Sequence, residues 1–264
     1  MAMQERDFVN RGLYLPEYGI VDPEQGNSQR LQEQYNQFLQ DLPYRAEIEQ
    51  HIDPFLTPDQ TPMSLGSSTA AILFNMRRFQ PEVYGHSQSV GDLAAAIAQE
   101  VGFELPIHEV KVAGDLHDIW KVKMRALTDH RGPFSDEQRE QYHQHPSMGA
   151  ALLHAWGYPI NIVDGARFHH CGIRYPLEAP NYPNVPNSLV PRMGKIINLA
   201  DYVIAARTAR SYKVVVPMDE LFARLDQALA MGSTDADLVA GFKSAVERYG
   251  EPWMRHSIHE DLAA

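Results

Sequence analysis

The sequence predicts an all-α fold. Apolar residues recur at three- and four-residue spacing from about residue 69 onward, alternating strand-like patterns are scarce, and 44% of the 264 residues are hydrophobic and 22% charged, as in a globular protein. Helical spacing gathers apolar side chains on one face of each helix, from which a shared core can form. We therefore expect a helical bundle over residues 69–264, preceded by a small segment over residues 1–68.

The N-terminal segment differs from the rest of the chain in charge. The first 60 residues hold 11 acidic and 4 basic residues, so most of the net charge of −11 lies there. Ser28–Leu42 has helical spacing, whereas Asp53–Ser68 is rich in Pro, Thr, Ser and Gly and is typical of a linker. We expect the segment to be helical or irregular. Two roles stay open, a cap that completes the core and a ligand-binding module.

The larger part is expected to contain a series of helices joined by short loops. Their expected ranges are Val90–Val101, Ile107–Leu127, a helix from Ser135 to about Leu153, Pro159–His170, Pro191–Thr208, Asp219–Met231 and Ala236–Tyr249. The helix at Ser135 opens with a capping box, because Gln138 follows three residues later. Five prolines make Cys171–Pro191 a loop rather than a continuous helix.

Composition removes several classes of protein. No apolar run approaches the roughly 20 residues of a membrane-spanning helix, and the start of the chain lacks the basic and apolar regions of a secretion signal, so we expect a cytoplasmic protein without membrane insertion. A sequence pI near 5.5 argues against extended nucleic-acid binding. Because Cys171 is the single cysteine, an intramolecular disulfide and a thiolate-rich zinc site are excluded. Any metal ion must be bound by histidine and carboxylate.

Histidine is unusually abundant, with 12 residues, and several histidines fall beside carboxylates at helical positions that should face the core. This inward-facing set comprises Glu82, His86, His117, Asp118, His145, His169, His170 and Asp201. A lone histidine on an apolar face is commonly a hydrogen-bonded core residue, but a buried carboxylate is costly unless a cation or strong donors meet it. Five imidazoles and three carboxylates on five helices therefore predict a catalytic cluster of more than one metal ion.

The order of these motifs resembles the HD-GYP branch of the HD phosphohydrolase superfamily. The matching motifs are His86-Ser87, His117-Asp118-Ile119-Trp120-Lys121, His145-Pro146-Ser147-Met148-Gly149, His169-His170, Ala200-Asp201 and Arg210-Ser211-Tyr212-Lys213, which together span about half of the chain. The resemblance implies an HD-domain helical bundle around two or three divalent ions, iron in the first place or manganese. It also implies a cyclic di-GMP phosphodiesterase that forms pGpG or GMP by attack of a metal-bridging hydroxide.

The resemblance also implies a role for each matching residue. The residues that correspond to terminal metal ligands are His86, His117, His145, His169, His170 and Asp201. Asp118 corresponds to the carboxylate that bridges two ions, Glu82 to an extra ligand in trinuclear members, and Lys121 to a catalytic lysine that binds the substrate phosphate. Arg210 and Lys213 correspond to the pair that contacts the dinucleotide. Independently of the resemblance, the aromatic ring of Tyr175 is a candidate to stack on a guanine base. The net positive charge of Arg192–Lys213 suits such a substrate, although a solvated basic helix face would have the same composition.

The sequence departs from the family pattern at several places, of which two adjoin the predicted site. Trp120 stands where the family has glycine, and Arg174 replaces the first residue of the Gly-Tyr-Pro signature in a shortened loop. A protein partner that binds through this loop is therefore an open question. Two alternatives to a cyclic di-GMP phosphodiesterase stay open. The first is a catalytically weak receptor for cyclic dinucleotides. The second is another HD-superfamily enzyme, either a phosphohydrolase of a different nucleotide or a di-iron oxygenase.

Overall fold

The structure is a computed structural model that describes residues 13–15, 19–21, 69, 72–73, 76–78, 80–130, 132–174, 185–208, 215–251 and 253. The chain divides into two compact units. The first unit comprises residues 1–84 and 118–163, and the second comprises residues 85–117 and 164–264. The predicted helix at 28–42, the linker at 53–68 and the boundary at 68 lie outside the described residues. They stay predictions.

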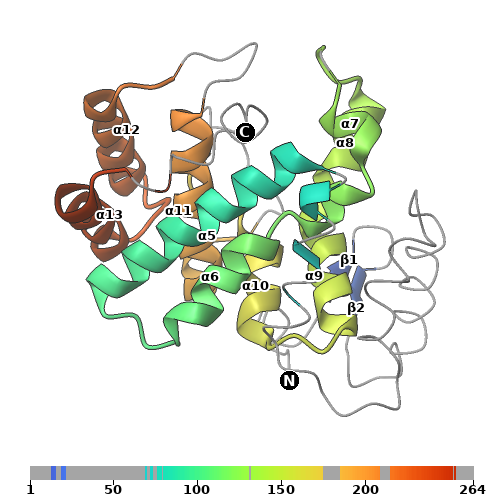
Figure 1. The fold of residues 1–264 in the computed structure, drawn as a ribbon, viewed down its shortest axis with the longest axis horizontal. Coiled ribbons are helices and arrows are strands. Elements are labelled where there is room, and N and C mark those ends of the chain that lie inside the picture. The colour runs from blue at the N-terminus through green and yellow to red at the C-terminus, as the bar shows by residue number, and fades with distance from the viewer. Residues whose placement is uncertain are drawn as a thin grey trace. The chain divides into compact units, whose positions relative to one another are not determined.

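The second unit is built from helices (Figure 1). They are α5 (Pro81–Val101, of which residues 81–84 belong to the first unit), α6 (Ile107–Leu116), α11 (Arg192–Arg207), α12 (Met218–Ala230) and α13 (Ala236–Tyr249), with a 3₁₀ turn η3 (Asn187–Leu189) before α11. Helix α11 packs against both α6 and α13. The fully buried side chains include Leu93, Ile97, Leu116, Ile196, Ile197, Leu199 and Phe242. Their burial supplies most of the free energy that holds these helices together.

Helices α5 and α6 cross at two glycines. A Cβ added at Gly114 would lie 2.5 Å from the Cα of Gly91, and one added at Gly91 would lie 2.8 Å from the carbonyl oxygen of Lys111. Real Cβ atoms do not approach other atoms this closely, so the backbones can meet only because both residues lack a side chain. The crossing fixes α6 against α5 close to the end of α6, where His117 follows.

The first unit contains shorter elements (Figure 1). They are the strands β1 (Leu13–Leu15) and β2 (Gly19–Val21), the 3₁₀ helix η2 (Ile119–Val122), and the helices α7 (Arg125–Thr128), α8 (Asp136–His143), α9 (His145–Ala155) and α10 (Ile160–Phe168, which continues into the second unit). The strands pair antiparallel with Tyr14 opposite Ile20, and α9 packs against η2 and β1. This short pair was missed by the sequence analysis.

The predicted helical class is confirmed. The two closing helices and α11 occur within one residue of their predicted ends, and α5 extends the predicted helix back to Pro81. The capping box is present, because Ser135 Oγ accepts from the amide of Gln138 at 3.1 Å and Gln138 Oε1 accepts from the amide of Ser135 at 2.9 Å. Among the described residues, no helix combines the length and apolar character needed to cross a bilayer.

Two predicted helices are interrupted in the structure. The helix expected over Ile107–Leu127 ends at Leu116 and is followed by η2 and α7, because Asp118 leaves the helical conformation with φ −103° and ψ 17°. The helix expected from Ser135 to Leu153 divides into α8 and α9 at Gln144. Both interruptions fall next to a histidine of the predicted metal cluster.

Candidate metal centre

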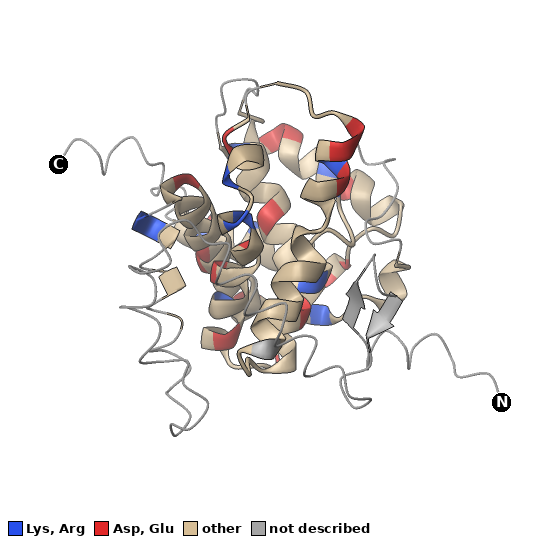
Figure 2. Cartoon of the chain, turned by 90° about the vertical axis from the view of Figure 1, so that its right-hand side faces the viewer, with Lys and Arg blue, Asp and Glu red and all other residues tan. Residues whose placement is uncertain are grey.

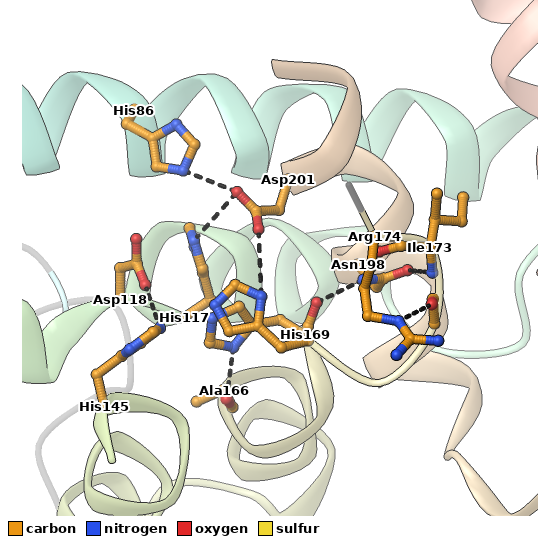
Figure 3. A network of polar contacts seen from close by, with 12 residues as sticks. His86, His117, Asp118, His145, Ala166, His169, Ile173, Arg174, Asn198 and Asp201 are labelled. Carbon is orange, nitrogen blue, oxygen red and sulfur yellow. Dashed lines mark hydrogen bonds and ion pairs between the residues drawn. The ribbon is translucent and has the colours of Figure 1, made fainter. Parts of the chain in front are cut away.

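Three histidines are anchored in the same way, each at a helix boundary. The Nδ1 atom of His117 lies 2.7 Å from the carbonyl oxygen of Gly114, and that of His145 lies 2.6 Å from the carbonyl oxygen of Tyr142. The Nδ1 atom of His169 lies 2.6 Å from the carbonyl oxygen of Ala166 (Figure 3). Each imidazole thus binds the carbonyl three residues before it.

These hydrogen bonds determine the tautomer of each ring. A carbonyl oxygen only accepts, so Nδ1 carries the hydrogen, and in the neutral imidazole Nε2 keeps its lone pair. Metal-binding histidines commonly donate their second ring N–H to a backbone carbonyl in this manner. All three side chains are at most 1% exposed. The rings are therefore held in the tautomer and orientation that a metal ligand requires.

The same hydrogen bonds explain why the predicted helices break. In a continuous helix, the carbonyl of residue i−3 would accept from the amide of residue i+1. The ring of His117 occupies the carbonyl of Gly114 in this way, in competition with the amide of Asp118. After His145 the next residue is Pro146, which has no amide hydrogen, so the carbonyl of Tyr142 is available to the ring.

In the second unit, four histidines and one carboxylate form a group that we call the Asp201 cluster (Figure 3). Its members are His86 on α5, His117 after α6, His169 and His170 after α10, and Asp201 on α11. Nε2 of His86 lies 2.9 Å from Oδ1 of Asp201, Nε2 of His117 lies 4.0 Å from the same oxygen, and Nδ1 of His170 lies 3.9 Å from Oδ2. One ligand atom each from His117, His169 and Asp201 lie within 4.8 Å of one another.

The electrostatic environment keeps Asp201 ionised. Burial alone would raise the pKa of this carboxyl, but the hydrogen bond from His86 and the charges of His86, His117 and His170 hold the pKa well below its usual range. The rings themselves are close, with centroids 4.8 Å apart for His117 and His169 and 5.4 Å apart for His86 and His117. A carboxylate encircled by imidazoles is a donor set that suits a divalent cation.

In the first unit, a second group surrounds Asp118, and we call it the Asp118 cluster. Lys121 donates from Nζ to Oδ2 of Asp118 at 2.6 Å, and Nε2 of His145 lies 3.4 Å from Oδ1. The Lys121 ammonium also lies over the ring of Tyr142, 5.2 Å from its centroid. Asp118 and His145 are buried, whereas the Lys121 side chain is 12% exposed. The predicted proximity of Lys121 to Asp118 is present.

The remaining predicted site residues are not part of the two clusters as defined above. Glu82 is exposed in the first turn of α5. Tyr175, Arg210 and Lys213 lie outside the described residues, so their predicted contacts stay predictions. Trp120 is buried in η2, where the ammonium of Lys123 lies 5.3 Å from its ring.

Cys171, which follows the histidine pair, is a buried thiol. Burial raises its pKa to about 12, against the opposing charges of Arg167 and Arg174. The thiol therefore stays protonated at neutral pH, as expected for an inert core cysteine rather than a reactive one.

The basic run at Arg192–Lys213 is largely neutralised where the structure describes it. Arg192 pairs with Asp235 and Asp237, Lys195 pairs with Asp235 at 3.0 Å, and Arg207 forms a double hydrogen bond with Glu251 at 2.9 and 3.0 Å. Figure 2 shows both signs of charge on the described helices. A count of local charge in the sequence leaves out these carboxylates, which come from later in the chain. The predicted contacts of Arg210 and Lys213, outside the described residues, stay predictions.

Sequence reasoning missed Asn198. This residue is 4% exposed on α11, and its side-chain amide bonds to the main chain of the turn that carries His169 and His170. The signal was present, since Asn198 is a polar residue inside the apolar run Ile196-Ile197-Asn198-Leu199-Ala200.

The described donor set fits divalent metal ions. Imidazole and carboxylate oxygen without thiolate suit iron, manganese or zinc, and three imidazoles already present an unprotonated Nε2. The chain passes from the Asp201 cluster to the Asp118 cluster between His117 and Asp118, which adjoin in the sequence. His117 and Asp118, one candidate ligand from each cluster, are thus consecutive residues linked by a single peptide bond.

A paired His-Asp at a helix end, followed by histidines on later helices, defines a class of helical metal-binding domain. Residues 83–206, just under half of the chain, match the family model of the HD domain. HD domains bind divalent metal ions, and in this chain His117, His169 and Asp201 form a group of the size and chemistry that can hold one.

Particular relatives come from two bacteria. Over 151 residues the chain is 30% identical to a cyclic di-GMP phosphodiesterase of Thermotoga maritima. The aligned region covers 55% of this chain and 40% of that protein. The chain thus spans well under half of this relative. Crystal structures of the HD domain of the L. monocytogenes phosphodiesterase PgpH superpose with a TM-score of 0.49. The structure of that domain in complex with cyclic di-AMP is 21% identical in sequence, and the match covers 66% of this chain and 92% of the PgpH chain. A second structure of the same domain is 19% identical, and the match covers 73% of this chain and 99% of the PgpH chain.

Proposed function

We propose that this protein is a metal-dependent phosphodiesterase that hydrolyses cyclic di-GMP to pGpG or GMP. The observation that carries the proposal is the repeated anchoring of His117, His145 and His169 through Nδ1, beside the carboxylates Asp118 and Asp201. The identity to a cyclic di-GMP phosphodiesterase supports the same class of substrate. The proposed metal ligands are His86, His117, Asp118, His145, His169, His170 and Asp201.

The number and identity of the ions are part of the proposal. Iron, or alternatively manganese, agrees with a ligand set of imidazole and carboxylate. Divalent ions bound by these residues would neutralise phosphoryl charge and activate water for attack on phosphorus. Two ions suffice for the ligands in the two clusters, because Glu82, the candidate third carboxylate, is exposed.

Lys121 is the proposed substrate-binding cation of the Asp118 cluster. Its ammonium is held by Asp118 at 2.6 Å and by the face of Tyr142, yet the side chain keeps 12% exposure. A nonbridging phosphate oxygen would compete with the carboxylate for one of its three hydrogens. Lys121 would then orient the phosphodiester and neutralise part of its charge. Tyr175, Arg210 and Lys213 are the proposed contacts to the rest of the dinucleotide.

The test is turnover by purified protein loaded with Mn²⁺, or with Fe²⁺ under anaerobic conditions. Products from cyclic di-GMP are separated by chromatography, with cyclic di-AMP and linear pGpG as parallel substrates. We expect formation of pGpG or GMP, its loss in Asp118→Ala, and its retention in His154→Ala, which removes a half-buried histidine of α9 that belongs to neither cluster.

Other outcomes separate the alternatives. Unchanged turnover in Asp118→Ala would refute the proposed site. Tight binding of cyclic di-GMP by metal-replete protein without product would indicate a receptor, and selective turnover of a different nucleotide would indicate another substrate. Trp120, which is buried in η2 two residues after Asp118, is the residue we would vary first in that case.

A further inference from the structure

Asn198 joins the helix that carries Asp201 to the turn that carries the histidine pair. It lies on α11 three residues before Asp201, and its side chain makes three hydrogen bonds (Figure 3). Nδ2 donates to the carbonyl of His169 at 2.7 Å and to the carbonyl of Ile173 at 3.1 Å, and Oδ1 accepts from the amide of Ile173 at 2.7 Å. The amide thus binds both ends of the turn from His169 to Ile173.

Only an amide side chain of this length provides these bonds. Two donors and one acceptor on a single planar group match two carbonyls and one amide, whereas an aspartate has no donor and an apolar residue has neither. Asn198 is 4% exposed, and its partners His169 and Ile173 are 0% and 2% exposed. The three main-chain groups therefore have little access to water that could replace a lost partner. Removal of the amide would therefore release the turn rather than rehydrate it.

Gly172 makes the contact possible. A Cβ added at Gly172 would overlap Oδ1 of Asn198 and would lie 3.0 Å from its Cγ and 3.2 Å from the carbonyl oxygen of Ser233. A side chain at this position would therefore displace the Asn198 amide or move the turn away from α11. The glycine therefore allows the turn to approach α11 closely enough for the three hydrogen bonds.

The bonds fix the main chain of a ligand. The His169 ring is already bound at Nδ1 by the carbonyl of Ala166, so its remaining freedom is movement of the turn itself. Asn198 restricts that movement relative to α11, and thereby relative to Asp201, whose Oδ2 lies 3.9 Å from Nδ1 of His170. Ligand geometry is normally set by such supporting groups.

We infer that Asn198 is a positioning residue that sets His169 and His170 against Asp201 for metal binding. The inference rests on the proposed function, because it presumes that these residues are ligands. Asn198 binds neither metal nor substrate in this scheme. It acts through the main chain of the histidine turn.

The experiment measures binding of Mn²⁺ without substrate. Free Mn²⁺ is quantified by electron paramagnetic resonance during titration of wild type, Asn198→Ala and Ser244→Ala, alongside thermal unfolding. Ser244→Ala is the matched control, since Ser244 Oγ donates to Glu100 at 2.6 Å between α13 and α5, away from both clusters. We expect about 10–100-fold weaker Mn²⁺ binding in Asn198→Ala, recovery of turnover at excess Mn²⁺, and wild-type affinity in Ser244→Ala.

The possible results are distinguishable. Equal Mn²⁺ affinity in Asn198→Ala and Ser244→Ala would overturn the inference and leave the proposed function standing. Strong Mn²⁺ binding by wild type without turnover would overturn the proposed activity, while the affinity ratio still decides the role of Asn198. Wild type that binds no Mn²⁺ would overturn both. If Asn198→Ala does not fold, the same titration is made with Gly172→Ala, in which the added methyl group displaces the Asn198 side chain without removing it. Unaltered Mn²⁺ affinity in Gly172→Ala would count against the inference.

Discussion

The Asp201 cluster and the Asp118 cluster differ in the groups that face their carboxylates. Asp201 meets the imidazoles of His86, His117 and His170, whereas Asp118 meets the ammonium of Lys121 together with the imidazole of His145. Imidazoles can give their lone pairs to a metal ion, but an ammonium can only donate hydrogen bonds. The comparison favours ion binding at the Asp201 cluster. Under the proposed function, the Lys121 ammonium of the Asp118 cluster would in addition exchange its hydrogen bond to Asp118 for one to an anionic substrate.

The largest expected effect is loss of a carboxylate ligand. Asp201→Ala should reduce the number of ions bound per chain and lower turnover by about 1,000-fold or more, because ion-mediated charge stabilisation is worth several kcal/mol and each 1.36 kcal/mol is tenfold in rate. Metal analysis after gel filtration, followed by the cyclic di-GMP assay, provides both values. A full complement of ions in this variant would show that Asp201 is not a ligand.

Lys121→Met should separate the roles of the two clusters. The variant keeps the length of the side chain but loses its charge, so we expect unchanged ion content and a turnover about 10–100-fold lower, equivalent to one charged hydrogen bond of about 1.5–3 kcal/mol. Steady-state kinetics and metal content are measured on the same preparation. Loss of ions in Lys121→Met would mean that the lysine supports the cluster rather than the substrate.

Gly114→Ala tests whether the helix crossing supports the Asp201 cluster. The added methyl group would meet the backbone of Gly91 at 2.5 Å, so α5 and α6 must separate, at a cost of about 1–3 kcal/mol in unfolding free energy. Urea denaturation measures this value. Gly132→Ala, where the nearest atom would be in the His130 ring at 3.3 Å, should change stability much less. Equal stabilities for the two variants would contradict close packing at the crossing.

A half-buried carboxylate of the second unit, Asp164, has a pKa shifted in the opposite direction from that of Asp201. Burial raises the pKa of Asp164 on α10 to about 7, and the charge of Arg167 only partly opposes this, whereas the pKa of Asp201 is lowered. Because the folded-state pKa of Asp164 is above the unfolded value, its contribution to stability is full below about pH 4 and is lost as the pH rises toward about 7.

The corresponding test is a pH series of urea denaturation for wild type and Asp164→Asn. Between pH 5 and pH 8 the stability of wild type should fall relative to the variant by about 1–2 kcal/mol, after allowance for partial exposure of a group shifted at 1.36 kcal/mol per pKa unit. A difference that is constant with pH would show that Asp164 titrates normally in the folded protein.

Sequence periodicity predicted the helices well and their interruptions badly. The apolar stripes of α5, α11 and α13 are long and regular, so their existence was evident from the spacing of Leu, Ile and Val. The breaks at His117 and Gln144 depend on side chains that take main-chain hydrogen bonds, which no apolar pattern records. Local chemistry therefore overrode a helical signal that continues through both positions.

The candidate site was predictable in its residue types but not in its supporting contacts. Histidines and carboxylates at inward positions were identifiable from the sequence, because burial of such groups without partners is energetically costly. Asn198 and Gly172 were not found, since their value depends on a contact between α11 and a turn some 25 residues earlier in the chain. Likewise, the pairing of Arg192 with Asp235 and Asp237 requires knowledge of the packing between α11 and α13.

The anchoring of three imidazoles to main-chain carbonyls also bears on the entropy of ion capture. A histidine with a freely rotating ring must lose that freedom when an ion arrives, and the loss subtracts from affinity. For His117, His145 and His169 the rotation is arrested when the helices form. Ion binding to these rings therefore involves little further ordering, which favours tight association from a dilute pool of ions.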